Sequence, residues 1–245
     1  MTLLTIIIAT LLVGLLSFVG VIFVGLKLDV RKITFYLISL ASGTLLGGAL
    51  LDLIPEAVEM KAPHTFTMVG VGIFFFFLLE KFLLWRHCHH HQHPNDHARP
   101  TAAAMILTGD AVHNFIDGII IATSFNVGFQ VGLSVTFAIV LHEIPQELGD
   151  FGVLVHSGFS VKKALTANFL ISLTAVVGAV ITHFFLGVAP NLQAYLLPIT
   201  AGGFLYVALA DLIPQLHEFV TPRQTWGQIA LFVIGFGMMM LLTHS

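Results

Sequence analysis

The chain has 245 residues, of which 57% are hydrophobic and only 9% are charged, and its mean hydropathy is +0.95. Because roughly a quarter of the residues in ordinary globular domains are charged, this composition excludes a soluble globular protein and indicates an integral membrane protein. The formal net charge of -3 says little about partners, although we expect the lipid bilayer to be one and nucleic acid not to be.

Eight apolar runs along the chain are long enough to cross a hydrocarbon core of ~30 Å. They are continuous runs rather than segments of about ten residues with alternating polarity, so helices are favoured over a β-barrel. The first run is too long for the apolar core of a signal peptide, and we count it as a helix. We therefore expect an all-α integral membrane protein, with residues 1–245 forming a single polytopic domain. The expected helices are 3–26, 33–58, 66–85, 102–125, 131–155, 164–186, 192–216 and 226–242.

The Lys and Arg residues between these helices are distributed unevenly. Eight of them fall in the loops after the first, third, fifth and seventh helices, and only Lys61 falls on the other side. Because cytoplasmic loops are enriched in Lys and Arg, we expect these four loops inside and both termini outside the cytoplasm of a cell (inner) membrane. The eight residues are Lys27, Arg31, Lys32, Arg86, Arg99, Lys162, Lys163 and Arg223.

Two segments resemble each other at a constant offset of 159 residues, GTLLGGALLDLIPEAVE at 43–59 and GGFLYVALADLIPQLHE at 202–218. Under the expected topology the shared motif ends on opposite sides of the bilayer, which is typical of the inverted repeats of secondary transporters. The repeat would make helices 1–3 and 6–8 the two halves and leave helices 4 and 5 between them. The alternative is that Asp and Pro suit the end of any apolar helix, so that the motif recurs by chance.

The fourth expected helix contains GDAVHNFIDG at 109–118, with four polar side chains in an otherwise apolar run. They stand at i, i+3, i+4 and i+7, which places them on one face of a helix. The centre of the run falls between the second and third of them, so this polar face lies near the middle of the bilayer. The four residues are Asp110, His113, Asn114 and Asp117.

The fifth expected helix contains LHEIPQELGD at 141–150. Its polar residues are His142, Glu143, Gln146, Glu147 and Asp150. The first and third share one face at i and i+4, and the remaining three share another. Pro145 has no backbone N–H, so we expect the carbonyl of Leu141 to be freed toward the site.

Five acidic groups lie on these two helices, and neither helix core contains a Lys or Arg. A carboxylate at the bilayer centre costs at least ~2.5–3.5 kcal/mol, which a bound cation would offset. Imidazole combined with carboxylate and amide oxygens suits zinc above all, then Fe²⁺, Mn²⁺ or Co²⁺, whereas an all-oxygen site would suit Mg²⁺ or Ca²⁺. The alternative is a buried hydrogen-bond network that joins the helices. The predicted metal ligands are His113, Asn114, Asp117, His142, Glu143, Gln146 and Glu147, with Asp110 and Asp150 as further candidates.

The sequence HNFIDG followed about thirty residues later by HEIPQELGD resembles the ZIP family of divalent metal transporters, especially the branch whose fifth helix reads HExPHExGD. GGFLYVALADLIP and the His-rich loop after the third helix are also similar to that family. The resemblance implies 3+2+3 helices with inverted outer triplets, and a mid-membrane site for metal that moves into the cytoplasm. It further implies that helices 4 and 5 move with 1 and 6 against 2, 3, 7 and 8.

The resemblance also implies how the ligands are divided between two metal positions. One position corresponds to His113, His142 and Gln146, and the other to Asn114, Asp117 and Glu143. The branch has His, and bacterial relatives have Glu, where this chain has Gln146. A neutral amide is a weaker ligand than either, so the number of metals bound stays open.

The expected cytoplasmic loop RHCHHHQHPNDHARP at 86–100 is rich in histidine. Neutral imidazole is a common metal ligand, so the loop could capture metal, and the alternative is a solvated, disordered linker. Its candidate ligands are His89, His90, His91 and His93. Because Cys88 is the only cysteine in the sequence, no intramolecular disulfide can form.

These features predict a transporter that imports divalent transition metals, with Zn²⁺ first and Fe²⁺, Mn²⁺, Cd²⁺ or Co²⁺ as further candidates, through helices 4 and 5. We expect neither an enzyme nor a prosthetic group, and the sequence is compatible with a homodimer. The alternatives are a metal efflux antiporter, a metal sensor and an intramembrane metal-dependent hydrolase. A hydrolase would use His142 and Glu143, but Gln146 replaces the second His of H-E-x-x-H. The chain has no G-x-x-x-x-G-K-[ST] loop for ATP.

Overall fold

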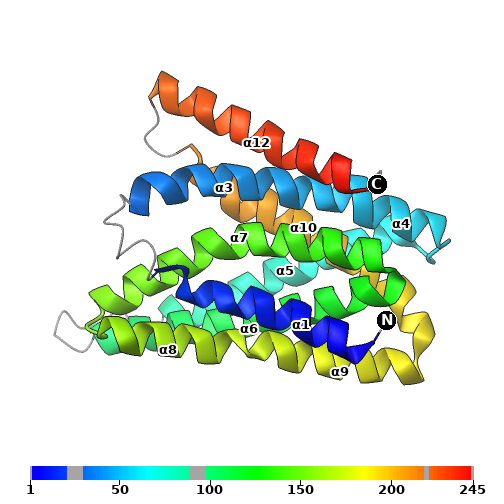
Figure 1. Cartoon of the computed structure of the whole chain (residues 1–245), viewed down its shortest axis with the longest axis horizontal. Coiled ribbons are helices and arrows are strands. Elements are labelled where there is room, and N and C mark those ends of the chain that lie inside the picture. Colours follow the sequence, from blue (N-terminus) through cyan, green and yellow to red (C-terminus); the bar gives the residue numbers. More distant parts are fainter. Residues whose placement is uncertain (1, 21–29, 89–97, 218–220, 244–245) are drawn as a thin grey trace.

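The computed structural model describes residues 2–20, 30–88, 98–217 and 221–243, and every regular element in these ranges is helical (Figure 1). Short 3₁₀ and π segments, labelled η, interrupt or extend several helices. The bounds are α1 (Leu3–Gly14), η1 (Leu15–Phe18), α3 (Val30–Gly47), η2 (Gly48–Leu53), α4 (Ile54–Glu59), α5 (Thr65–Cys88), α6 (Ala98–Val127), α7 (Phe129–His156), α8 (Val161–Ser172), α9 (Thr174–Val188), η3 (Pro190–Leu192), α10 (Gln193–Tyr206), η4 (Val207–Leu212), α11 (Ile213–Gln215) and α12 (Pro222–Thr243).

Five described helical stretches are long and apolar enough to cross a membrane, so the chain is a multi-pass membrane protein. They are Tyr36–Glu59, Thr65–Phe82, Val161–Val188, Gln193–Gln215 and Gln224–Leu242. Leu3–Phe18 is a shorter apolar helix. α6 and α7, with 30 and 28 residues, are long enough to span a bilayer, but their polar side chains lower their hydropathy. The expected count of eight spans stays a prediction.

The two copies of the repeated motif adopt the same local structure. Each helix widens into a π-helical segment, η2 in the first copy and η4 in the second, and the two segments lie 159 residues apart. An α-helix resumes after each, with Pro55 or Pro214 in its first turn. Because proline cannot donate the hydrogen bond that an α-helix requires, a widened turn just before it relieves the mismatch.

Close helix crossings also follow the repeat. α3 packs along α12, and α10 packs along α5. A Cβ atom added to Gly43 of α3 would lie 2.1 Å from the carbonyl oxygen of Phe232. A Cβ atom added to Gly202 of α10, at the equivalent place in the motif, would lie 2.2 Å from that of Val69. Glycine is therefore required at both crossings, where the two backbones touch.

α6 and α7 occupy the interior of the bundle. α6 packs against α7 and α9, and α7 packs against α3, so both helices have neighbours on several sides. In Figure 1, α3 and α12 lie along one edge of the molecule, α8 and α9 along the opposite edge, and α7 between them. Apolar side chains such as Ile121, Phe125 and Ile139 are fully buried at this centre. Most polar side chains of α6 and α7 are thus enclosed by protein, whereas those of His113, Gln146 and Asp150 are partly exposed.

Of the positive residues used to predict orientation, Lys162 and Lys163 are exposed at the start of α8. The side chains of Lys27, Arg31, Lys32, Arg86, Arg99 and Arg223 lie outside the described part of the structure. The orientation itself stays a prediction.

Candidate metal centre

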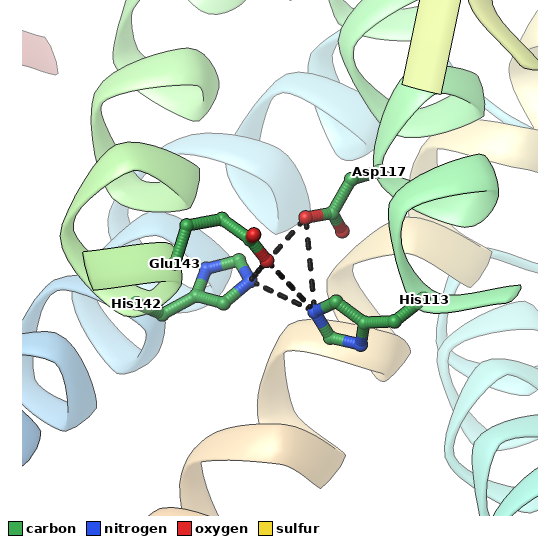
Figure 2. A group of neighbouring side chains, drawn as sticks. All are labelled: His113, Asp117, His142 and Glu143. Atoms are coloured by element: carbon green, nitrogen blue, oxygen red, sulfur yellow. Dashed lines mark hydrogen bonds and ion pairs between the residues drawn. The ribbon is translucent and has the colours of Figure 1, made fainter. Parts of the chain in front are cut away.

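Four side chains from α6 and α7 converge in the interior of the bundle, as Figure 2 shows. His113 and Asp117 lie one turn apart on α6, and His142 and Glu143 are adjacent on α7. One nitrogen or oxygen atom from each of the four residues lies within 4.8 Å of the others. We call these four residues the histidine cluster. They are the part of the predicted ligand set that the structure brings to a single point.

The spacing of the four atoms matches the dimensions of a zinc site. The two Nε2 atoms of His113 and His142 lie 3.2 Å apart. Oε1 of Glu143 lies 3.2 Å from Nε2 of His113 and 3.4 Å from Nε2 of His142. Oδ2 of Asp117 lies 3.4 Å from His142 and 3.8 Å from His113. A tetrahedral zinc ion with bonds of about 2.0–2.1 Å holds its ligand atoms about 3.3 Å apart.

The orientation of the His142 ring is set from outside the cluster. Its Nδ1 lies 3.3 Å from the backbone carbonyl oxygen of Ala138, one turn earlier on α7. Donation from Nδ1 to that carbonyl leaves Nε2 unprotonated, with its lone pair facing the cluster. This is the tautomer that a metal ligand requires.

The carboxylates of the cluster are deeply buried. Asp117 and Glu143 are 3% and 1% exposed, and their oxygens Oδ2 and Oε1 accept no hydrogen bond of good geometry. Among the described residues, their ion-pair partners are the two histidines and no Lys or Arg. A buried acceptor without a partner costs about 1–3 kcal/mol, and more when it is charged. A divalent cation would satisfy both oxygens.

A second group of polar side chains lies beside the cluster, and we call it the amide network. Asn114 donates from Nδ2 to Oδ1 of Asp110 at 2.7 Å and to the backbone oxygen of the same residue at 3.2 Å. Gln146 places its Nε2 3.4 Å from the same carboxylate oxygen. The structure therefore pairs Gln146 of α7 with Asp110 of α6.

Two further predicted ligands lie outside the histidine cluster. Glu147 is buried and accepts a 2.9 Å hydrogen bond at Oε2 from Nδ2 of Asn168 on α8. Asp150 lines a cavity of about 250 Å³ that also borders His142, Gln146 and Asp211. The loop residues His89, His90, His91 and His93 lie outside the described residues.

Sequence reasoning did not identify Asn168 as part of a polar contact. The signal available was a single amide in the apolar stretch of α8, and nothing in the spacing of that helix points to Glu147. Asp211 was recognised as part of the repeated motif, but its place beside His142 in the cavity depends on how α10 and η4 pack.

Comparison with known proteins gives a consistent result. The sequence profile of the family described as "ZIP Zinc transporter" matches residues 2–100 and 85–243. The chain is 33% identical over 276 residues to the zinc transporter YKE4 of Saccharomyces cerevisiae, an alignment that covers 96% of this chain and 79% of that protein. It is 40% identical over 151 residues to human zinc transporter ZIP6, and 40% identical over 131 residues to human zinc transporter ZIP4. These two alignments cover 58% and 54% of this chain but only 20% of each human protein.

Proposed function

The chain belongs to the ZIP family of zinc transporters, and we propose that it carries divalent transition-metal ions, Zn²⁺ first among them, across the membrane into the cytoplasm. The observation that carries the proposal is the histidine cluster, in which four ligand atoms lie at the spacing of a zinc tetrahedron inside a multi-pass membrane protein. The metal ion is the cargo of this site. Membership of a transporter family argues against the hydrolase alternative.

The chemistry of the cluster supports zinc and related ions as cargo. Two imidazole nitrogens and two carboxylate oxygens suit Zn²⁺ and also accept Fe²⁺, Mn²⁺, Co²⁺ or Cd²⁺. A carrier must release its ion, and a set without thiolate binds less tightly than a cysteine site. We propose that the order of preference among these ions begins with Zn²⁺.

We propose eight membrane spans in a 3+2+3 arrangement, with the outer triplets related as an inverted repeat. Three observations support it: the paired π segments η2 and η4, the equivalent crossings at Gly43 and Gly202, and the matching pairs α3 with α12 and α10 with α5. α6 and α7 would be the two central helices.

The packing also supports a division into a moving and a static part. α6 packs on α9 and α7, and α1 packs on α9, whereas α3 packs with α12 and α5 with α10. α7 also packs against α3, where the two parts would meet. We propose that α1, α6, α7, α8 and α9 move together against the other helices. The ligands of the histidine cluster would then travel as one unit.

The proposed direction rests on the cavity beside the cluster. The cavity reaches from His142 to Asp150, near the end of α7 that precedes Lys162 and Lys163. Those exposed lysines indicate the cytoplasmic side. Acidic residues along this path would attract a cation leaving the cluster toward the cytoplasm.

Metal uptake into proteoliposomes tests the proposal, with Zn²⁺, Cd²⁺, Fe²⁺, Mn²⁺ and Co²⁺ compared side by side. We expect saturable Zn²⁺ uptake that Glu143→Ala abolishes and that His183→Ala, a histidine of α9 outside the cluster, leaves intact. Accumulation of metal by cells expressing the protein supports import, and depletion points to the efflux alternative. Uptake that is absent for every ion in folded wild-type protein, or unaffected by Glu143→Ala, would overturn the proposed function.

A further inference from the structure

Asp110 is a deeply buried carboxylate that the histidine cluster does not use. It is 4% exposed and lies one turn before Asn114 on α6. Its Oδ1 accepts from Asn114 Nδ2 at 2.7 Å and faces Gln146 Nε2 at 3.4 Å, so one oxygen receives amide donors from two helices. The position of Asp110 therefore constrains side chains on both α6 and α7.

The contact with Asp110 decides which way the Asn114 amide points. Asn114 Nδ2 lies within hydrogen-bond distance of two acceptors of Asp110, Oδ1 and the backbone oxygen. The opposite orientation would place the amide oxygen against these two acceptors, which is unfavourable. Asn114 Oδ1 is consequently turned away from Asp110, and it is buried without a hydrogen-bond partner.

We propose that Asp110 is a positioning residue that keeps the oxygen of Asn114, rather than its NH₂ group, available to the metal ion in transit. Asn114 directly follows His113 and lies within one turn of Asp117, so it is next to the histidine cluster in the helix. An amide oxygen attracts a cation, whereas an amide NH₂ repels it. The inference rests on the proposed transport function, because it assigns a role within the same site.

Two other roles for Asp110 make different predictions. Its second oxygen, Oδ2, is also buried without a partner, so Asp110 could instead bind the metal directly through its charge. It could also serve only to hold α6 and α7 together. The Asp110→Asn variant distinguishes direct metal binding from positioning. Asparagine keeps an acceptor oxygen for Asn114 and Gln146 but loses the charge.

The experiment compares Asp110→Asn, Asp110→Leu, Asn114→Asp and the double variant Asp110→Leu/Asn114→Asp in the full-length protein. Zn²⁺ affinity is measured by equilibrium binding to purified protein, and KM and maximal rate are measured in proteoliposomes. Asn126→Leu is the matched control, because Asn126 makes a similar amide contact, to the carbonyl of Ala122, further along α6. Asp110→Ala gives the same comparison if the leucine variant does not insert.

We expect Asp110→Asn to stay within about threefold of wild type in Zn²⁺ affinity, and Asp110→Leu to weaken it by about tenfold or more, since the amide then loses its fixed orientation. In the Asn114→Asp background the same Asp110→Leu change should cost less than about threefold, because a carboxylate presents an oxygen in either orientation. The control should match wild type.

Three results would overturn the inference. Equal damage from Asp110→Asn and Asp110→Leu would show that the charge is needed and that Asp110 binds metal itself. An equal cost of Asp110→Leu in both backgrounds would assign a purely structural role. If Asp110→Leu left Zn²⁺ affinity unchanged in both backgrounds, Asp110 would have no role in the site. Absence of uptake by wild-type protein would instead contradict the proposed function, and the binding measurements would still decide whether Asp110 positions Asn114.

Discussion

The histidine cluster and the amide network lie on the same two helices and contain buried carboxylates, yet these carboxylates have different partners. In the cluster, Asp117 and Glu143 face two ring nitrogens and accept no hydrogen bond of good geometry. In the network, Asp110 receives N–H groups from Asn114 and Gln146 at Oδ1, and only its Oδ2 is without a partner. The supply of amide donors, rather than depth or charge, distinguishes the two groups.

This difference means that Asp117 and Glu143 need a bound cation more than Asp110 does. A carboxylate held by amide donors keeps part of the stabilisation it had in water, because a hydrogen bond to a charged group is worth about 1.5–3 kcal/mol. A carboxylate without donors depends on an ion for that stabilisation. A metal ion should therefore bind most tightly at the histidine cluster.

The largest expected effect is the loss of a cluster ligand. His142→Ala or Glu143→Ala removes one corner of the tetrahedron and should reduce Zn²⁺ uptake by about 100-fold or more, equivalent to about 2.7 kcal/mol of binding. Uptake in proteoliposomes, normalised to inserted protein, provides the measurement. If either variant kept full uptake while His183→Ala did not, the division between the two groups would be wrong.

Metal should also stabilise the folded protein through the cluster. At 100 times the dissociation constant, Zn²⁺ should add about 2.7 kcal/mol to the unfolding free energy of the wild type. The same addition should give almost no shift for Glu143→Ala, because the ion has lost its site. Thermal unfolding in detergent with and without Zn²⁺ measures this. An undiminished shift in the variant would place the bound metal elsewhere, with the loop at 86–100 as the next candidate.

Much of this site could be predicted from the sequence, because helical spacing alone aligns the polar residues of α6 on one face. That the polar faces of α6 and α7 meet needed only the assumption that such faces pair in a membrane. The family resemblance divided the two histidines from Asp117 and Glu143 between two metal positions, whereas the structure brings one ligand atom of each of the four within 4.8 Å of the others. Membership of the ZIP family was also predicted correctly, from the motifs in the fourth and fifth helices.

The contacts of Gln146 and Glu147 could not be predicted in the same way. Their neighbours depend on how far α7 is rotated against α6 and α8, and a rotation of one residue changes every partner. Gln146 lines the same cavity as His142, as the helical spacing predicted, but its amide contact with Asp110 was not predicted. The π segments η2 and η4 could not be predicted from the sequence either, although the prolines that follow them were recognised as part of the repeat.

Gln146 offers a way to convert the amide network into a cation site. Gln146→Glu replaces a donor to Asp110 with a second carboxylate, and two carboxylates at this distance repel unless a cation lies between them. We expect Zn²⁺ affinity to rise by about tenfold, or about 1.4 kcal/mol, and the maximal uptake rate to fall because release is slower. Gln146→Met, similar in size and uncharged, is the control. Unchanged affinity in Gln146→Glu would mean that position 146 does not reach the ion.

The smallest expected effect comes from the glutamate one turn after Glu143 on α7. Glu147 accepts a hydrogen bond from Asn168, so it resembles the amide network rather than the cluster. Glu147→Gln keeps an acceptor oxygen for Asn168, and exchanging a charged acceptor for a neutral one changes a hydrogen bond by about 1 kcal/mol. Zn²⁺ uptake should therefore stay within about fivefold of wild type. Glu143→Gln is the matched variant on the same helix, and it should lower uptake by about tenfold or more, since the cluster loses a charge that no donor replaces. Equal losses in the two variants, measured in the same proteoliposome assay, would mean that amide donors do not decide which carboxylates act on the metal.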